Sequence, residues 1–367
     1  MLSHGGDKKQ IHELIIEIVK VLSNIACRCN MRRKPKERIM LKILGLGNAL
    51  VDVLTVLDSD DLLQRLSYPK GSMQLVGKEQ SVELQNAIHD RERFFVTGGS
   101  ASNTIAGLAK LGVSCGFIGK VGEDEEGSFF GRDMKSCGVE PFLIKSDLPT
   151  GVCVSLISPD SERTMITYLG AACELQSVDL KLSQFQGYDL FHIEGYLVQN
   201  YDLIETALKL AKEAGLKISL DLASYNVVED NLEFLHRITS EYVDIIFANE
   251  EEAKSFTGLA PNEAADLLAE KYCEIAVVKK GKDGSIIRRG EEVYEVLPLK
   301  GVEAVDTTGA GDLYASGFLC GYSNGHSLKY CGELGALVSG NIVQVVGTKM
   351  DEIRWNAIRA ESCVDLI

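Results

Sequence analysis

A glycine-rich segment could bind an anion beside a carboxylate. Residues 306–312 read Asp-Thr-Thr-Gly-Ala-Gly-Asp, and apolar residues recur at helical spacing from Ala310 to Tyr322. Glycines at a helix start let backbone N–H groups approach a phosphate, which the positive end of the helix dipole attracts. Asp312, in the first turn, can accept a proton from a hydroxyl. The alternative is a turn capped by Asp306 or Thr307, which accounts for most isolated Gly-x-Gly segments.

Strand and helix patterns alternate after Met40, which predicts an α/β fold with a mostly parallel sheet covered by helices on both faces. The expected strands are 41–46, 188–193, 217–221, 242–248 and 275–279, and the expected helices are 103–111, 129–137, 202–214 and 261–271. Two pairs of shorter strands, 51–57 with 72–76 and 152–158 with 164–169, interrupt this alternation and indicate inserted hairpins.

Polar residues follow the expected strands. In open α/β sheets ligands bind beyond the carboxyl ends of strands, so these residues are candidates for one site. They are Asn48, Asp52, Glu194, Asp221, Asn249 and the segment 279–281. Polar strand ends are common, so the pattern is supporting evidence only. His192 lies within an apolar strand and is interpreted as a core histidine.

The segment from Gly45 to Asp52 excludes one nucleotide-binding fold. Gly45 and Gly47 follow a strand as in a dinucleotide-binding turn, but Leu50 stands where the third glycine is required, so a nicotinamide-dependent oxidoreductase is disfavoured. Asp52 could instead accept hydrogen bonds from two vicinal hydroxyls. Its alternative is a surface residue that caps a turn.

A second glycine pair precedes the helix that contains Asn103. Gly98 and Gly99 would let the backbone approach a sugar closely, and the Asn103 amide can both donate to and accept from hydroxyls. An ordinary helix cap by Ser100 or Ser102 would explain the same pattern.

Together these motifs resemble the ribokinase-like (PfkB) family of carbohydrate and nucleoside kinases, from about residue 41 to residue 349. The resemblance implies a three-layer α/β/α fold with a small β-sheet lid from about 50–77 and 151–170. It implies that Asp312 is the catalytic base and that Gly309, Ala310 and Gly311 form the anion hole. The substrate would be held by Asn48, Asp52, Gly98, Gly99 and Asn103.

The same resemblance implies ATP and Mg²⁺ as cofactors. Asn249 and Glu252 would organise Mg²⁺ largely through water, and the nucleotide would be bound by Lys280, Gly281, Gly284 and Thr307. Arg163 aligns with a lid arginine placed to meet the transferred phosphate. Some family members also bind K⁺ beside the anion hole, and Asp306 with the loop 346–348 occupies the matching positions. The alternatives are a capped helix start for 249–252, a hairpin turn for 280–284 and a solvated charge for Arg163.

Within the family the chain looks most like the adenosine kinases. Residues 168–173 carry this likeness, and Tyr196 falls where those enzymes stack an aromatic ring on the base. The chain departs from them at Ala49, where proline is usual, and at Glu194, where a small residue is common. The predicted reaction is phosphorylation of a nucleoside 5′-hydroxyl, with adenosine as the substrate. A ribokinase- or fructokinase-like sugar kinase and a non-catalytic nucleoside-binding regulator stay as alternatives.

Composition limits the remaining classes. The 367-residue chain carries a net charge of −15, which argues against nucleic acid as a partner. Its ten cysteines are scattered without metal-ligand spacing, as in a reduced, cytoplasmic protein. Residues 1–39 form a basic segment too polar to cross a membrane, interpreted as a dispensable extension of a kinase domain at 40–367. The alternative is a basic amphipathic helix that contacts a membrane surface or a partner. We expect a monomer or homodimer with a small-molecule substrate and no membrane partner.

Overall fold

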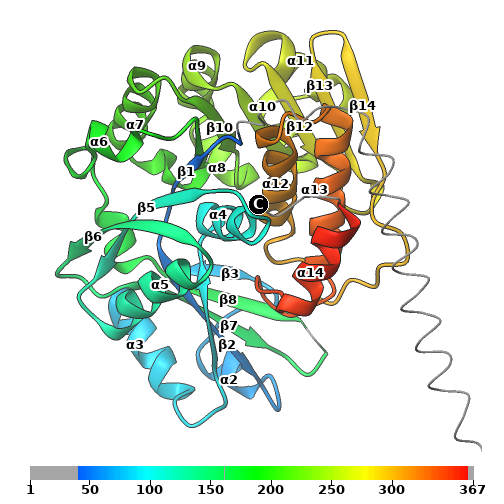
Figure 1. Cartoon of the computed structure of the whole chain (residues 1–367). Helices are drawn as coiled ribbons and strands as arrows, with labels where there is room; N and C mark the ends of the chain where they lie inside the picture. The colour runs from blue at the N-terminus through cyan, green and yellow to red at the C-terminus, as the bar shows by residue number, and fades with distance from the viewer. Residues whose placement is uncertain (1–39, 161, 363–367) are drawn as a thin grey trace, which may run out of the picture. The chain divides into compact units, whose positions relative to one another are not determined.

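The computed structural model describes residues 40–160 and 162–362. The predicted extension, residues 1–39, and the last five residues lie outside the described part. The described chain contains a nine-stranded sheet in the order β14-β13-β12-β11-β10-β9-β1-β5-β6 (Figure 1). Its strands are β1 Ile43–Leu46, β5 Cys115–Gly122, β6 Val139–Ser146, β9 Leu190–Glu194, β10 Lys217–Asp221, β11 Ile245–Asn249, β12 Ile275–Lys279, β13 Ser285–Arg289 and β14 Glu292–Val296.

The seven neighbouring strands β12, β11, β10, β9, β1, β5 and β6 are parallel to one another. At the β12 edge, β13 and β14 extend the sheet by antiparallel pairing. The mostly parallel sheet expected from the alternation of elements is therefore confirmed. Side chains of successive residues point to opposite faces of a sheet. Along β11, Ile245 and Phe247 enter one buried cluster, while Ile246 and Ala248 enter the other. The apolar strands are buried on both faces.

Helices cover both faces of the sheet. Those packed in the first cluster are α4 Ser100–Lys110, α5 Glu125–Ser136, α12 Ala310–Ser323, α13 Leu328–Ile342 and α14 Glu352–Glu361. Those packed in the second are α6 Leu182–Phe185, α7 Tyr201–Glu213, α8 Tyr225–Asp230, α9 Leu232–Tyr242, α10 Glu250–Thr257 and α11 Pro261–Lys271. The result is the expected three-layer α/β/α arrangement. Short 3₁₀ turns, η1 Gly170–Glu174, η2 Ser177–Asp179, η3 Gly195–Gln199 and η4 Gly281–Asp283, join some elements.

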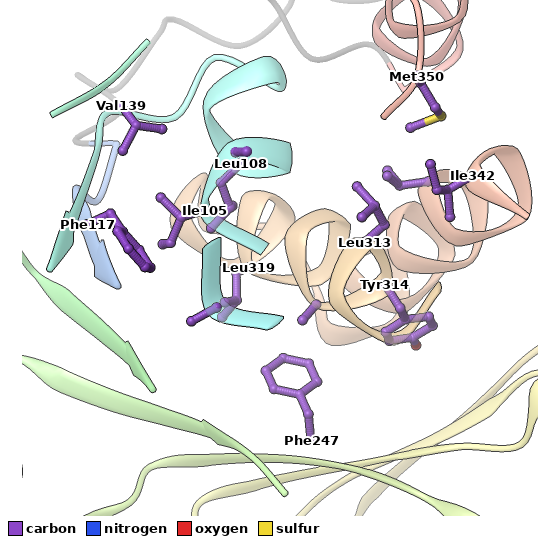
Figure 2. Close-up of a cluster of buried hydrophobic side chains, with 14 of the residues drawn as sticks. Ile105, Leu108, Phe117, Val139, Phe247, Leu313, Tyr314, Leu319, Ile342 and Met350 are labelled. Carbon is purple, nitrogen blue, oxygen red and sulfur yellow. The ribbon is translucent and has the colours of Figure 1, made fainter. Parts of the chain in front are cut away.

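The helix with the glycine-rich start is anchored by the first cluster. Figure 2 shows Leu313 of α12 near Ile342 of α13, with Phe247 of the sheet facing the helices. Leu319 of α12 and Ile105 of α4 belong to the same buried cluster. Phe247 also packs edge-on against Phe318, with ring centroids 5.3 Å apart. This packing fixes the position of the N-terminus of α12 relative to the strand ends.

A second sheet of five strands contains both predicted insertions. Its order is β3-β8-β7-β2-β4, with β2 Leu50–Val56, β3 Met73–Leu75, β4 Phe94–Gly98, β7 Gly151–Ile157 and β8 Arg163–Tyr168. Helices α2 Asp61–Arg65 and α3 Lys78–Ala87 lie between its strands in the chain. This sheet occupies the lower part of Figure 1 and is the lid predicted from the sequence. The predicted hairpin of 152–158 with 164–169 is confirmed, but the predicted pairing of 51–57 with 72–76 is wrong, because β2 pairs with β4 and β7 and β3 pairs with β8. The prediction also missed β4, a short strand that begins with two exposed phenylalanines.

The chain crosses between the two sheets at two short junctions. Residues 47–49 connect β1 of the central sheet directly to β2 of the lid, and Gly99 connects β4 of the lid to α4. Gly99 has φ of +95°, and a Cβ at this position would overlap the backbone oxygen of Asn48. The two junctions therefore pack against each other and require glycine here. Within the described residues, no helix is long and apolar enough to cross a membrane.

Candidate active site

One large cavity lies at the carboxyl ends of the central strands and reaches the lid sheet. Its volume is about 1390 Å³. Most of the predicted site residues line it, although they come from distant parts of the chain. They are Asn48, Asp52, Gly99, Asn103, Tyr196, Asn249, Glu252, Gly281, Gly284, Thr307, Gly309, Ala310, Gly311 and Asp312. Gly98, Arg163 and Lys280 were also predicted but do not line the cavity.

Asp312 lies in the first turn of α12 and is held by two side chains from α4. Ser100 Oγ donates to one carboxylate oxygen at 2.7 Å, and Asn103 Nδ2 donates to the other at 3.0 Å. Burial raises the pKa of Asp312 to about 6, although both hydrogen bonds favour the ionised form. The carboxylate is thus oriented and ionised at neutral pH. A general base needs both properties.

The start of α12 has the conformation that an anion site requires. Gly309 precedes the helix with φ of +72°, in the left-handed region. The first N–H groups of a helix lack acceptors within the helix and can bind an anion. The Ala310 N–H, however, donates to the Thr307 carbonyl at 3.1 Å. Of the three N–H groups predicted to hold a phosphoryl group, this one is already engaged.

Lys279 is a cationic residue beside this helix start, and the sequence singles it out only as part of the polar segment 279–281, without a role of its own. It is the last residue of β12, and a Cβ built on Gly311 would lie 3.0 Å from its Nζ. Nζ donates to Asp221 at 2.8 Å, and both side chains are largely buried. Desolvation acts to lower the pKa of Lys279, but the carboxylates of Asp221 and Glu252 raise it above its usual value. The site therefore contains a fixed positive charge next to the glycine-rich start of α12.

Glu194 is a second residue that the sequence singles out as a site candidate only because it follows an expected strand. This fully buried carboxylate, at the end of β9, accepts from the backbone N–H of Asn48 at 2.9 Å and from its Nδ2 at 2.6 Å. Its other oxygen accepts from the Ala101 N–H at 2.7 Å. Burial raises the pKa of Glu194 to about 7, although these bonds oppose the shift. Glu194 thus ties both junctions to the central sheet. The sequence suggested instead that it could bind a ligand.

We expect Glu194→Gln to lower the free energy of unfolding by about 1–3 kcal/mol, the usual cost of an unsatisfied buried polar group. A carboxamide has one acceptor oxygen, so its NH₂ group would face either the Ala101 N–H or the Asn48 donors. Urea unfolding of the variant measures the loss, and Glu213→Gln on the exposed end of α7 is the control. Equal stability of the wild type and Glu194→Gln would contradict the bracing role.

Asp52 lies on β2 of the lid and faces the cavity. A Cβ on Gly98 would overlap the Asp52 carboxylate, so the predicted glycine pair makes room for this side chain. Desolvation raises the pKa of Asp52 to about 7, and the positive charges of Arg163 and Lys349 act against the increase. Asn48 and Asn103 also line the cavity. These polar groups could together bind neighbouring hydroxyls.

Asn249 and Glu252 form a reciprocal cap at the start of α10. Glu252 accepts from the Asn249 backbone N–H at 2.8 Å and from its Nδ2 at 2.7 Å, while Asn249 Oδ1 accepts from the Glu252 N–H at 2.8 Å. Burial, with Asp221 nearby, raises the pKa of Glu252 to about 7. The predicted capping alternative is therefore correct, and both residues also line the cavity.

The segment 280–284 forms the hairpin turn that is the alternative interpretation. It connects the antiparallel strands β12 and β13, and Gly281 and Gly284 both have positive φ and line the cavity. Lys280 closes the turn through a 2.7 Å backbone hydrogen bond to the Gly284 carbonyl. The glycines are thus placed to contact a ligand through their backbone.

Two further predicted residues have defined partners. The Tyr196 hydroxyl donates to the Ala223 carbonyl at 3.2 Å, and the residue lines the cavity. His192 is fully buried, its Nδ1 lies 2.9 Å from Ser219 Oγ, and its Nε2 has no hydrogen-bond partner in the described chain. Burial lowers the pKa of His192 to about 4, so this core histidine is neutral.

Comparisons with known proteins agree with this arrangement. The sequence profile of the pfkB family of carbohydrate kinases matches residues 70–354, so the chain belongs to that family. It is therefore a phosphotransferase of the group that acts on sugars and nucleosides. Kinases of this kind use ATP and Mg²⁺.

The similar proteins include both adenosine kinases and sugar kinases. The crystal structure of adenosine kinase from Sinorhizobium meliloti is 32% identical, with a TM-score of 0.79 over 88% of this chain and 99% of that one. A probable sugar kinase from Rhizobium etli matches equally, at 32% identity and a TM-score of 0.79 over 89% and 100% of the two chains. Adenosine kinase from Dictyostelium discoideum is 27% identical over 84% of this chain and 96% of its own length.

Proposed function

We propose that this protein transfers the γ-phosphoryl group of ATP to the primary 5′-hydroxyl of a nucleoside, with adenosine as the acceptor. One observation carries the proposal. The oriented carboxylate of Asp312 lies at the glycine-rich start of α12, inside a cavity that is also lined by Asp52 of the lid and Gly284 of the loop between β12 and β13. The candidate base, the proposed phosphate position, and residues that could contact the acceptor and the nucleotide therefore all line one cavity.

Asp312 would accept the proton of the attacking hydroxyl as its oxygen bonds to phosphorus. Phosphoryl transfer depends mainly on positioning and on stabilising charge at the phosphate oxygens. The Gly311 backbone and the Lys279 ammonium are fixed beside that position and need no reorganisation. Asn103 would hold Asp312 in the orientation that the reaction requires.

The cavity is large enough for two ligands, and its lining supports a nucleoside rather than a free sugar as the acceptor. Pockets for one small ligand usually measure about 300–1,000 Å³, so about 1390 Å³ leaves room for an acceptor and ATP together. Met73, Leu75 and Met165 of the lid line the cavity with Tyr196. This apolar surface suits a purine base, and Asp52 suits the ribose hydroxyls.

Asn249 and Glu252 would hold Mg²⁺ through its waters, beside Asp221. The carboxylates of Asp221 and Glu252 are both buried and close enough to affect each other, and Lys279 supplies a single positive charge to the pair. Such a set of oxygen donors with excess negative charge favours a hard cation. The described residues contain no cluster of three or more acidic, histidine or cysteine ligands, so a cage made only of protein is not formed there. When bound, Mg²⁺ would neutralise charge on the phosphates.

Replacing Asp52 with asparagine should raise the KM for adenosine by about 10- to 150-fold and change kcat little. The expected factor corresponds to about 1.5–3 kcal/mol for hydrogen bonds to a charged group. Steady-state kinetics above pH 7, where Asp52 is ionised, measure the effect. Asp58→Asn, an exposed change on the same lid, is the control. An unchanged KM would remove Asp52 from the acceptor site.

An ADP-release assay with ATP and Mg²⁺ tests the acceptor class, with adenosine, inosine, ribose and fructose each supplied alone. The proposal predicts turnover with adenosine. Turnover with ribose or fructose alone would keep the mechanism and replace the acceptor by a sugar. Tight adenosine binding without ADP release from any acceptor would favour the non-catalytic regulator.

A further inference from the structure

Arg163 connects the lid to the loop before α12. It is the first residue of β8, yet its guanidinium reaches Thr308, whose Oγ1 accepts from Nη1 at 2.7 Å. Its Nη2 forms an ion pair with Asp306 at 2.6 Å, and the two side chains are only 12% and 10% exposed. The guanidinium was predicted to meet the transferred phosphate. It is instead bound to the loop that positions the anion site.

The Asp306 carboxylate is fully occupied by protein donors. One oxygen accepts from the Thr308 N–H at 3.0 Å and from Thr308 Oγ1 at 2.8 Å. The other accepts from the Gly347 N–H at 2.6 Å and pairs with Arg163. A carboxylate offers about four lone-pair positions, and all four are used here.

These contacts do not fit the K⁺ site that the family resemblance suggested at Asp306 and residues 346–348. K⁺ sites in proteins surround the ion with several oxygens that replace its waters. A K⁺ at Asp306 would have to displace the guanidinium or lie beside its positive charge in a poorly solvated region. Thr348 Oγ1 is buried without a hydrogen-bond partner among the described residues. One hydroxyl, however, does not form a coordination shell.

We propose that Arg163 supplies, from the lid, the positive charge that organises the Asp306–Thr308 loop, and that the enzyme is therefore independent of K⁺. The predicted K⁺ independence of turnover rests on the proposed function, because it can be measured only if the protein phosphorylates an acceptor. Arg163 is a positioning residue in this account. It acts on the helix start of α12 through Asp306 and Thr308 and does not touch the reacting atoms.

The first test compares turnover in K⁺, Na⁺ and tetramethylammonium salts at equal ionic strength. Wild-type turnover should agree within about twofold in all three. Arg163→Met removes the charge and keeps an apolar chain, so its turnover should fall at least about 10-fold in tetramethylammonium and recover in part in K⁺. Arg163→Lys keeps a positive charge and should stay independent of K⁺. Arg237→Met removes the surface partner of Glu205 and is the matched control.

A second measurement does not depend on catalysis. The melting temperature of the ligand-free wild type should be the same in K⁺ and tetramethylammonium, whereas Arg163→Met should gain a K⁺-specific increase because the ion now binds the folded state. Adding Asp306→Asn to Arg163→Met should abolish that increase. If no acceptor is phosphorylated, the proposed function fails, but the melting temperatures still show whether K⁺ binds the folded wild type.

Two results would overturn the inference. One is a wild-type enzyme activated several-fold by K⁺ over tetramethylammonium. The other is a K⁺-dependent melting temperature of the wild type that disappears in Thr348→Val, which would place a K⁺ site at that hydroxyl in the presence of Arg163. If Arg163→Met does not fold, the wild-type and Arg163→Lys comparisons still decide between the two accounts.

Discussion

Asp312→Asn is expected to lower turnover at least about 10²-fold and to leave adenosine and ATP binding nearly unchanged. Loss of a general base usually costs about 10²–10⁴-fold. The substitution should not disturb the fold, because the asparagine oxygen can still accept from Asn103 Nδ2. Its NH₂ group can donate to Ser100 Oγ, which now acts as the acceptor.

The pH dependence separates loss of a base from loss of structure. In the wild type, kcat at saturating adenosine should rise with pH through a pKa near 6 and then level off, because the protonated Asp312 below that pH cannot accept a proton. The ratio kcat/KM would also include the ionisation of Asp52, whose pKa is about 7. The rise in kcat should be missing in Asp312→Asn. Asp266→Asn on the exposed side of α11 is the control. Comparable turnover in Asp312→Asn would remove the base assignment.

Lys279→Met is expected to lower turnover by about 10²–10³-fold, the scale for removing one preorganised donor to developing negative charge. The ammonium lies beside Gly311 at the anion-binding helix start. The single variant also leaves the buried Asp221 without its partner, which lowers stability. Kinetics and melting temperature must therefore be measured together.

A double variant separates these two effects. Lys279→Met combined with Asp221→Asn removes both charges of the pair, so much of the lost stability should return while turnover stays low. If turnover also returns in the double variant, Lys279 is only the structural partner of Asp221. In that case the charge on the phosphate must be stabilised by other groups.

Residues within one local motif could be predicted from the sequence. The segment 306–312 encodes its own turn and helix start, and the polar ends of parallel strands meet at one edge because the sheet topology brings them there. Asp312, Gly309 and Asn48 accordingly lie in one cavity. The predicted helix 103–111 begins three residues late, because Ser100 to Ser102 were taken only as possible caps.

Residues whose roles depend on distant partners could not be predicted in the same way. Glu194 braces Asn48 only because β9 pairs with β1, which brings together residues 146 positions apart. Arg163 meets Asp306 only when the lid lies against the loop before α12. Lys279 and Lys280 are adjacent in sequence, and β12 ends at the first of them. Side chains two residues apart on a strand point to the same face, and Val277 belongs to the buried cluster that also contains α12. This alternation is the signal that could have placed Lys279, rather than Lys280, on the α12 side of the sheet.

The most direct test of the central claim is product analysis after incubation with ATP, Mg²⁺ and adenosine, with 5′-deoxyadenosine as the matched acceptor. The account predicts equal amounts of ADP and adenosine 5′-phosphate by mass spectrometry and phosphorus NMR, and no phosphorylated product from 5′-deoxyadenosine. Phosphorylation of 5′-deoxyadenosine, or a phosphate on a secondary hydroxyl of adenosine, would contradict it.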